Sequence, residues 1–168
     1  MMGFMCSGKS KVGSLLAKRI NFKYIDTDGC IVKETGLSIP EIFEQKGEPE
    51  FRKIEKEIVN RVSRLDKHVV SLGGGAVVDP DNWERIASTG TTVTLSYPPD
   101  IILKRVSRKT DRPLLNQESD DEKLNRIVEL MDKRRNFYSR ADLFLHLNRE
   151  IPAAQVADMI AGYFGAWA

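Results

Sequence analysis

The sequence predicts a single α/β domain in which helices cover both faces of a parallel sheet. Apolar residues alternate between helical spacing and short strand-like runs along the whole chain. Strands that alternate with helices need crossover connections, which are typical of a parallel sheet. The length of 168 residues fits one domain. No internal repeat, low-complexity tract or Gly/Ser linker divides the chain.

Each element follows from apolar spacing or from a capping residue. Helical spacing of apolar residues predicts helices over residues 10–20, 51–65, 124–138 and 151–164. Three more helices are expected to begin at Ser38, which precedes Glu41 at capping-box spacing, at Asp79-Pro80 and at Pro98-Pro99. Strands are expected over residues 22–25, 69–72, 91–96 and 143–147, with His68 and His146 as strand residues.

The composition argues against several classes of function. The chain has 26 Lys and Arg against 24 Asp and Glu, a net charge of +2, which gives no reason to expect nucleic-acid or membrane-surface binding. Its apolar runs are far shorter than the roughly 18–20 residues of a membrane span. The two isolated cysteines, Cys6 and Cys30, have no ligand spacing for zinc and, without an export signal, indicate a reducing cytoplasm.

The most specific motif is GFMCSGKS at residues 3–10, which fits the GxxxxGK[ST] pattern of a phosphate-binding loop and precedes a helix. Backbone N–H groups of such a loop surround the phosphates. In this pattern the lysine reaches the β- and γ-phosphates and the following hydroxyl ligates Mg²⁺. The alternative, a chance glycine turn, is much less favoured. The candidate nucleotide-binding residues here are Gly3, Cys6, Ser7, Gly8, Lys9, Ser10 and Lys11.

Two features of this loop stand out. Cys6 occupies a position where many such loops carry another glycine, and a passive replacement is favoured over a redox-sensitive thiol. A phosphate-binding loop follows a strand, yet only Met1 and Met2 precede Gly3. We therefore expect the first strand to be truncated, with a short apolar strand encoded upstream.

Two carboxylates follow the second apolar run. Asp26 and Asp28 stand at the carboxyl end of an expected strand, where ligands gather in open α/β sheets. Residues two apart in an extended segment share a face. One carboxylate could hold a Mg²⁺ water, making Ser10 and Asp26 the candidate metal residues, while Asp28 accepts a proton from an attacking hydroxyl. A helix cap plus a surface acid explains the pair equally well.

Two arginines are expected on apolar helix faces. Arg134 continues the apolar stripe that contains Met131 and Tyr138, and Arg52 follows Phe51 at the start of another apolar helix. An unpaired buried charge costs several kcal/mol, so Arg134 should have an anionic partner, either a structural acid or a bound anion. Two arginines that converge on one carboxylate would give bidentate recognition of an acidic metabolite.

Two further segments could contact a ligand. Gly73, Gly74 and Gly75 follow a buried strand, and close approach of backbone to a ligand explains them better than a loose loop. Residues 104–112 are basic. A solvated loop is the simplest interpretation, but a mobile loop that carries Arg112 could close over phosphates and exclude water.

Together these motifs resemble the shikimate kinase family. The shared residues run in the family's order from Gly3 to about Pro152. They are GFMxSGKS at 3–10, DTD at 26–28, GExxFRxxE at 47–55, SLGGGA at 71–76, RPLL at 112–115 and RxxxY at 134–138. The phosphate-binding loop alone would indicate only a nucleotide-binding protein, whereas the ordered set is highly specific.

The resemblance implies a nucleoside-monophosphate-kinase-like fold of three layers, with a central five-stranded parallel sheet flanked by helices. It implies one domain over residues 1–168, a substrate-binding region at about 28–60 and a mobile lid at about 108–120. The implied reaction transfers the γ-phosphate of ATP to the 3-hydroxyl of shikimate, a step of aromatic amino acid biosynthesis, with Mg²⁺ as cofactor. The resemblance also implies a monomer. The expected location is the cytoplasm, as the two isolated cysteines indicate.

On the nucleotide side, the resemblance gives Lys9 and Ser10 the roles of the phosphate-binding loop, and Asp26 would help to hold Mg²⁺ through water. Arg112 would be a catalytic lid arginine on the ATP phosphates. Arg149 matches, less closely, a family arginine near the adenine. Lys11 departs from the family pattern, because Ser or Thr commonly stands there.

On the substrate side, Asp28 would contact the shikimate hydroxyl and act as the base. Arg52 and Arg134 would clamp the shikimate carboxylate, with the Gly73–Gly75 backbone beside the ring. Two other functions remain alternatives. A gluconate or nucleotide kinase would share the phosphate-binding loop but is not expected to have both arginines and the three glycines. A non-catalytic kinase-like domain would be expected to lack some of these residues, and all are present.

Overall fold

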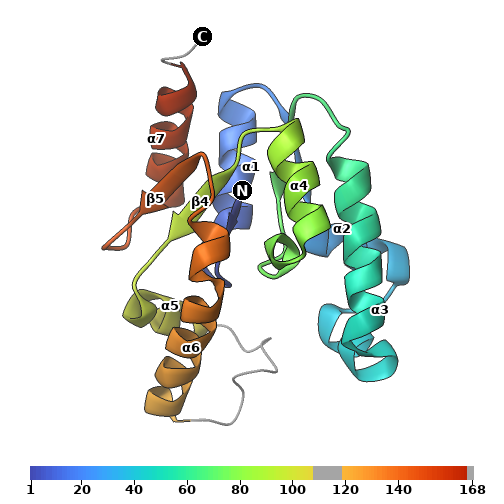
Figure 1. The fold of residues 1–168 in the computed structure, drawn as a ribbon. Coiled ribbons are helices and arrows are strands. Elements are labelled where there is room, and N and C mark those ends of the chain that lie inside the picture. Colours follow the sequence, from blue (N-terminus) through green and yellow to red (C-terminus); the bar gives the residue numbers. More distant parts are fainter. Residues whose placement is uncertain (108–118, 166–168) are drawn as a thin grey trace.

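The structure is a computed structural model that describes residues 1–107 and 119–165 (Figure 1). Five parallel strands form its centre: β1 (Met2–Gly3), β2 (Lys23–Asp26), β3 (His68–Ser71), β4 (Val93–Ser96) and β5 (Leu143–His146). They make a three-stranded sheet in the order β1-β4-β5 and a two-stranded sheet, β2-β3. Arg112 and most of the expected lid lie outside the described residues.

The first strand was expected to be truncated, and this expectation is partly wrong. Met2 and Gly3 do form a strand, which pairs with Thr94 and Leu95 of β4. On its other side, the backbone N–H of Leu72 donates to the Met1 carbonyl at 3.0 Å, which joins the two sheets. The expected single five-stranded sheet is divided because β1 is too short to form a full ladder with β3. The five strands still lie in the spatial order β2-β3-β1-β4-β5.

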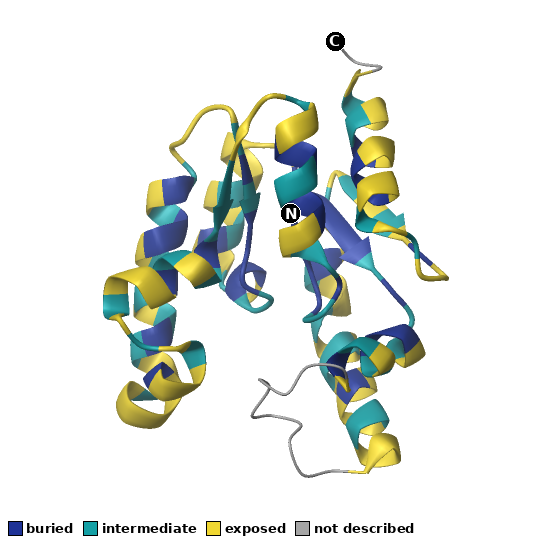
Figure 2. Cartoon of the chain, turned by 180° about the vertical axis from the view of Figure 1, so that it is seen from behind, coloured by how far each residue is buried: buried dark blue, intermediate teal, exposed yellow. Residues whose placement is uncertain are grey.

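Helices cover both faces of the sheets. Their bounds are α1 (Lys9–Arg19), α2 (Thr27–Thr35), α3 (Ile39–Val62), α4 (Pro80–Thr89), α5 (Pro99–Val106), α6 (Asp120–Tyr138) and α7 (Ala153–Gly165), with a 3₁₀ turn at Ala76–Val78. Helix α1 packs against β2, β3 and α7. Figures 1 and 2, which view the molecule from opposite sides, show α4 on one face and α1 on the other. The predicted three-layer α/β class is confirmed.

Most helix boundaries agree with the sequence signals. Ser38 forms the predicted capping box with Glu41, and Asp79 caps α4 with Pro80 in its first turn. Helix α2 was not predicted, because its nine residues contain too few apolar side chains to show a helical period. Helix α3 runs through the region expected as two helices, with a kink at Gly47, whose φ of 77° is left-handed.

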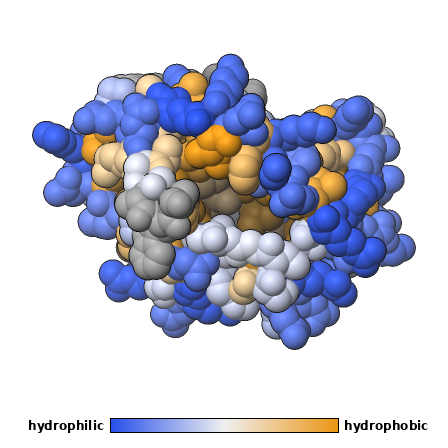
Figure 3. Space-filling view, turned by 90° about the horizontal axis from the view of Figure 1, so that it is seen from above, coloured by the Kyte–Doolittle hydropathy of each residue, from blue (hydrophilic) through white to orange (hydrophobic). Residues whose placement is uncertain are grey.

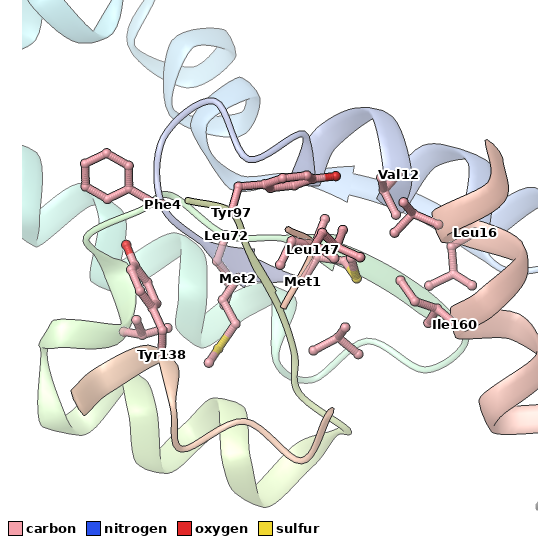
Figure 4. Close-up of a cluster of buried hydrophobic side chains, with 14 of the residues drawn as sticks. Met1, Met2, Phe4, Val12, Leu16, Leu72, Tyr97, Tyr138, Leu147 and Ile160 are labelled. Atoms are coloured by element: carbon pink, nitrogen blue, oxygen red, sulfur yellow. The ribbon is translucent and has the colours of Figure 1, made fainter. Parts of the chain in front are cut away.

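Two hydrophobic clusters stabilise the fold. The larger lies among the sheets, α1, α5, α6 and α7, and Figure 4 shows its side chains, from Met1 and Met2 to Tyr138 and Ile160. The smaller one lies between α2 and α3 and contains Ile31, Ile42, Phe51, Ile58 and Val62. Helices α2 and α3 therefore pack around a core of their own.

The amino ends of the strands have few side chains that could act in catalysis or bind a charged ligand. Figure 3 looks onto this end and shows a hollow over apolar side chains. A cavity of 140 Å³ there is lined by Met1, Met2, Val62, Leu65 and neighbouring residues. Among the described residues that line it, His68 has the only titratable side chain. None of the helices in the described part of the chain has the length and hydrophobicity that a membrane span needs.

Candidate active site

A cleft of about 810 Å³ opens at the carboxyl ends of the strands. This is where the sheet connections of an open α/β fold place ligands. Its walls come from segments that are far apart in the sequence: residues 5–12, Asp26, Asp28, Leu72, Gly74, Tyr97, Arg105 and residues 150–153. The cleft therefore brings the phosphate-binding motif and both predicted carboxylates together.

The phosphate loop, residues 3–10, depends on its glycines. Gly3 has a φ of 136°, and a Cβ there would lie 2.4 Å from the Leu95 carbonyl oxygen, so only glycine fits. Gly8 precedes α1 with a φ of 88° and makes no side-chain cap. The first turn of α1 contains no acidic residue. The N–H groups at this helix start are thus available to an anion in the cleft.

Cys6 adopts a left-handed backbone conformation, with a φ of 58°. This explains why glycine is common at this position, because a Cβ in the left-handed region costs about 1–2 kcal/mol. The Cys6 carbonyl accepts a hydrogen bond from Arg105 Nη1 at 3.2 Å. The side chain is half-buried and the thiol is free. Cys6 therefore puts backbone strain into the loop.

Two polar side chains of the loop suit a phosphate ligand. The Ser7 hydroxyl is buried at the cleft and has no hydrogen-bond partner among the described residues. Such an orphaned group is costly unless a ligand or water satisfies it. Lys9 Nζ donates to the Phe4 carbonyl at 3.0 Å, which holds the ammonium over the loop. Both groups point to an anion as the natural occupant of the loop.

Ser10 and Asp26, the two predicted metal residues, are in direct contact. Ser10 Oγ donates to Asp26 Oδ2 at 2.6 Å. The other oxygen, Asp26 Oδ1, accepts from the backbone N–H groups of Asp28 and Gly29 and caps α2. Asp26 therefore fits both interpretations left open by the sequence, the cap and the site residue. We call Ser10 and Asp26 the metal pair.

The chemistry of the metal pair fits Mg²⁺, which prefers oxygen ligands. This ion usually keeps several water molecules and is bound by one or two protein side chains together with the phosphates of a substrate. Within the described residues, no group of three or more His, Cys, Asp or Glu side chains could hold a metal ion by itself. A hydroxyl and one carboxylate next to a phosphate loop are consistent with an ion that arrives together with a nucleotide.

Beside the loop, four charged side chains from three helices face the turn at Gly73–Gly75. We call Asp28, Arg52, Glu55 and Arg134 the charged cluster. Arg52 Nη1 donates to Glu55 Oε2 at 2.7 Å, and Arg52 Nη2 donates to Glu48 at 3.0 Å. Glu55 is 2% exposed. Its burial raises the pKa of the Glu55 carboxyl, although the bond and charge of Arg52 lower it.

Arg134 has no acidic partner within the described residues at ion-pair distance. Its Nη1 lies 3.5 Å from the Gly74 carbonyl oxygen, which also accepts from Tyr138 Oη at 2.6 Å. The expected structural acid is thus absent from the described part of the chain, and the charge of Arg134 acts on the buried Glu55 carboxyl only at longer range. A half-buried guanidinium without a paired acid is suited to binding an anionic ligand.

Two of the three glycines, Gly73 and Gly75, make room for the charged cluster. A Cβ on Gly73 would lie 2.6 Å from Asp28 Oδ1 and 2.9 Å from Glu55 Oε1, and one on Gly75 would lie 2.7 Å from Arg52 Nη1. The Gly73 N–H donates to Thr27 Oγ1 at 2.9 Å. The loose-loop interpretation is therefore wrong. The close approach is to charged side chains of the site itself.

Three residues of this region were missed as site residues by the sequence analysis. Glu55 is the last residue of the motif at 47–55, and Tyr138 is the last residue of the motif at 134–138. The position of Glu55 between Phe51 and Ile58 on an apolar helix face indicates a buried carboxylate, which needs a charged partner. Arg105 belongs to the basic stretch that was interpreted as solvated. The structure instead stacks its guanidinium 4.0 Å from the centre of the Tyr97 ring and pairs it with Glu150 at 3.3 Å.

The remaining predicted residues lie at the edges of this arrangement. Lys11 lines the cleft and is exposed. Arg149 is also exposed but does not line the cleft, although its neighbour Glu150 does. Its predicted place beside an adenine has no support from the cleft geometry. Arg112 lies outside the described residues.

Comparison with known proteins agrees with this geometry. The family model for shikimate kinase matches residues 5–163. A shikimate kinase of Geobacter metallireducens is 43% identical over 163 residues, which cover 97% of this chain and 89% of that protein. The shikimate kinase of Caldanaerobacter subterraneus is 40% identical over 97% of this chain and 94% of that protein.

Solved structures show the same relationship. The shikimate kinase of Acinetobacter baumannii, determined in complex with shikimate, superposes with a TM-score of 0.88 at 31% identity and covers 98% of this chain and 90% of its own. Family motifs, full-length relatives and fold therefore agree. The chain belongs to the shikimate kinase family and is an ATP-dependent kinase of shikimate.

Proposed function

We propose that the cleft transfers the γ-phosphate of ATP to the 3-hydroxyl of shikimate, with the phosphate loop holding the nucleotide and the charged cluster holding the acceptor. The observation that carries this assignment is that Asp28 borders both sites. Asp28 lines the same cleft as Lys9 and Ser10 and also lies beside the glycine turn of the charged cluster. A hydroxyl placed near Asp28 would therefore face the phosphates.

Nucleotide binding rests on the backbone of the loop. The N–H groups at the start of α1 and the Ser7 hydroxyl would bond the phosphate oxygens, and Lys9 would leave the Phe4 carbonyl for the β- and γ-phosphates. The metal pair would hold Mg²⁺, which neutralises the charge on these oxygens when bound. The guanidinium of Arg112 is proposed to stabilise the same charge.

Acceptor binding rests on the two arginines of the charged cluster. Arg134, which has no described acid partner, would bond the shikimate carboxylate directly. Arg52 would share its remaining N–H groups with that carboxylate while Glu55 and Glu48 hold its guanidinium in place. This fixes the ring so that one hydroxyl points to Asp28.

Asp28 is proposed as the base. Its carboxylate would accept the proton of the 3-hydroxyl as the oxygen attacks the γ-phosphorus, and ADP leaves with the former β–γ bridging oxygen. Catalysis by this arrangement comes from positioning and from fixed charges more than from strong bases. We further propose that the protein is monomeric and cytoplasmic. Its free thiols Cys6 and Cys30 are consistent with a reducing compartment.

The test is ADP release with ATP and Mg²⁺ in the presence of shikimate, gluconate or a nucleoside monophosphate. We expect turnover with shikimate alone. Turnover with gluconate or a nucleotide and none with shikimate would overturn the substrate assignment. Binding without turnover of any acceptor would favour the non-catalytic alternative.

A further inference from the structure

One hydroxyl group beside the metal pair has no part in the proposed reaction. Tyr24 lies in β2, two residues before Asp26. Its phenol donates to Asp26 Oδ2 at 3.2 Å, the same oxygen that accepts from Ser10 Oγ. We propose that Tyr24 is a positioning residue of the magnesium site, whose hydroxyl holds the Asp26 carboxylate toward Ser10. This inference rests on the proposed function, because the metal pair is part of it.

Packing against α1 helps to position the ring of Tyr24. A Cβ on Gly13 of α1 would be 3.0 Å from Tyr24 Cε2 and 2.8 Å from Ser71 Oγ. The tyrosine ring therefore lies against the bare backbone of α1. Ser71, at the end of β3, donates to the Lys9 carbonyl at 3.2 Å. The ring is thus held between the helix that follows the phosphate loop and the two-stranded sheet.

The hydroxyl completes the fixation of one carboxylate. Asp26 Oδ1 is held by the N–H groups of Asp28 and Gly29, and Oδ2 is held by Ser10 and Tyr24. If Ser10 directs its lone pairs to a metal ion, it can still donate its proton to Oδ2. Tyr24 then supplies a second donor from the protein. Outer groups that orient a metal-holding carboxylate raise the affinity for the metal.

The variant Tyr24→Phe removes this hydroxyl and keeps the packed ring. We would measure ADP affinity as a function of Mg²⁺ concentration and, separately, in EDTA. We expect the Mg²⁺ concentration for half-maximal tightening of ADP binding to rise by roughly three- to tenfold, the effect of losing one hydrogen bond. ADP affinity in EDTA should stay unchanged, and saturating Mg²⁺ should restore kcat. Tyr163→Phe, which changes an exposed tyrosine of α7, is the matched control.

The outcomes separate this inference from the proposed function. An unchanged Mg²⁺ requirement in Tyr24→Phe, with a wild type that needs Mg²⁺, would overturn the role of Tyr24 alone. Equal weakening of ADP binding with and without the metal would also overturn it, because the hydroxyl would then act on the loop. A wild type whose ADP affinity ignores Mg²⁺ would overturn both the metal pair and this inference.

Discussion

The two sides of the cleft are built in different ways. The phosphate loop is one continuous segment whose shape comes from backbone conformation, with left-handed residues at Gly3, Cys6 and Gly8. The charged cluster combines side chains of α2, α3 and α6 around a turn that follows β3. The loop therefore depends on local sequence, whereas the cluster depends on how distant helices pack. Substitutions in the phosphate loop should therefore affect the use of ATP, and substitutions in the charged cluster should affect the binding of shikimate.

The largest effect is expected from Lys9→Met, on the nucleotide side. Losing a charged donor aimed at the transferred phosphoryl group should lower kcat by roughly 10²–10³. Shikimate affinity, measured by calorimetry in the absence of nucleotide, should not change. A loss of shikimate affinity of similar size would show that the two sides are not separable.

On the acceptor side, Arg134→Ala should weaken shikimate binding by roughly 10- to 100-fold, as expected for lost hydrogen bonds between charged groups. The KM for ATP should change little, because Arg134 does not line the cleft around the phosphate loop. Steady-state kinetics with each substrate varied in turn makes the comparison. Equal loss for both substrates would contradict the carboxylate clamp.

A smaller effect on the same side should come from Gly75→Ala. The new methyl group would lie 2.7 Å from Arg52 Nη1 and must displace a guanidinium that Glu48 and Glu55 hold. We expect the KM for shikimate to rise by about tenfold, because small misplacements of a positioning group are costly. Gly74→Ala is the matched control, since its Cβ would have 3.6 Å to Arg134 Nη1. Similar effects of both variants would contradict the packing role of Gly75.

The pH dependence of stability should report the buried carboxyl of the cluster. Burial raises the pKa of Glu55. The folded protein then binds this proton more tightly than the unfolded chain does. The stability that the proton supplies is full below the ordinary value of 4.5 and is lost as the pH rises through the raised pKa.

Urea unfolding of the wild type and Glu55→Gln across this range tests that sign. Relative to the variant, the unfolding free energy of the wild type should decline above pH 4.5, with a slope of at most about 1.4 kcal/mol per pH unit. The carboxyl of Glu122 should contribute stability that increases with pH instead of declining. Hydrogen bonds from the backbone and side chain of Ser119 lower its pKa. Its contribution is present above the ordinary carboxyl pKa and is lost as the pH falls.

The smallest effect should be a stabilisation by Cys6→Gly, in the loop. Relief of the left-handed conformation is worth about 1–2 kcal/mol, and the greater freedom of glycine in the unfolded chain removes about 0.5–1 kcal/mol. We expect a net gain of about 0.5–1 kcal/mol in thermal or chemical unfolding. Cys6→Ser keeps the Cβ and should show no gain. A gain with serine would indicate that the thiol, not the backbone, is unfavourable.

The sequence by itself determined the α/β class, most helix starts and the phosphate loop. These features depend on short-range rules: the apolar period, the capping pairs such as Ser38 with Glu41, and glycines at positive φ. It also placed Ser10 and Asp26 in one site, because both follow the ends of parallel strands, and such ends meet at one edge.

Only the tertiary structure decided how the other residues meet. Packing converted Glu55 into a buried partner of Arg52, brought Tyr24 to the metal pair, and stacked Arg105 on Tyr97 where the sequence suggested a solvated loop. It also made a strand of Met2–Gly3, because β4 and Leu72 offer backbone partners on both sides of residues 1–3. The partners in these side-chain pairs are only two to eight residues apart, but their surroundings come from distant segments: Glu55 lies beside the Gly73 turn, and the Tyr24 ring lies against α1. No local pattern specifies which distant segment will pack against a given side chain.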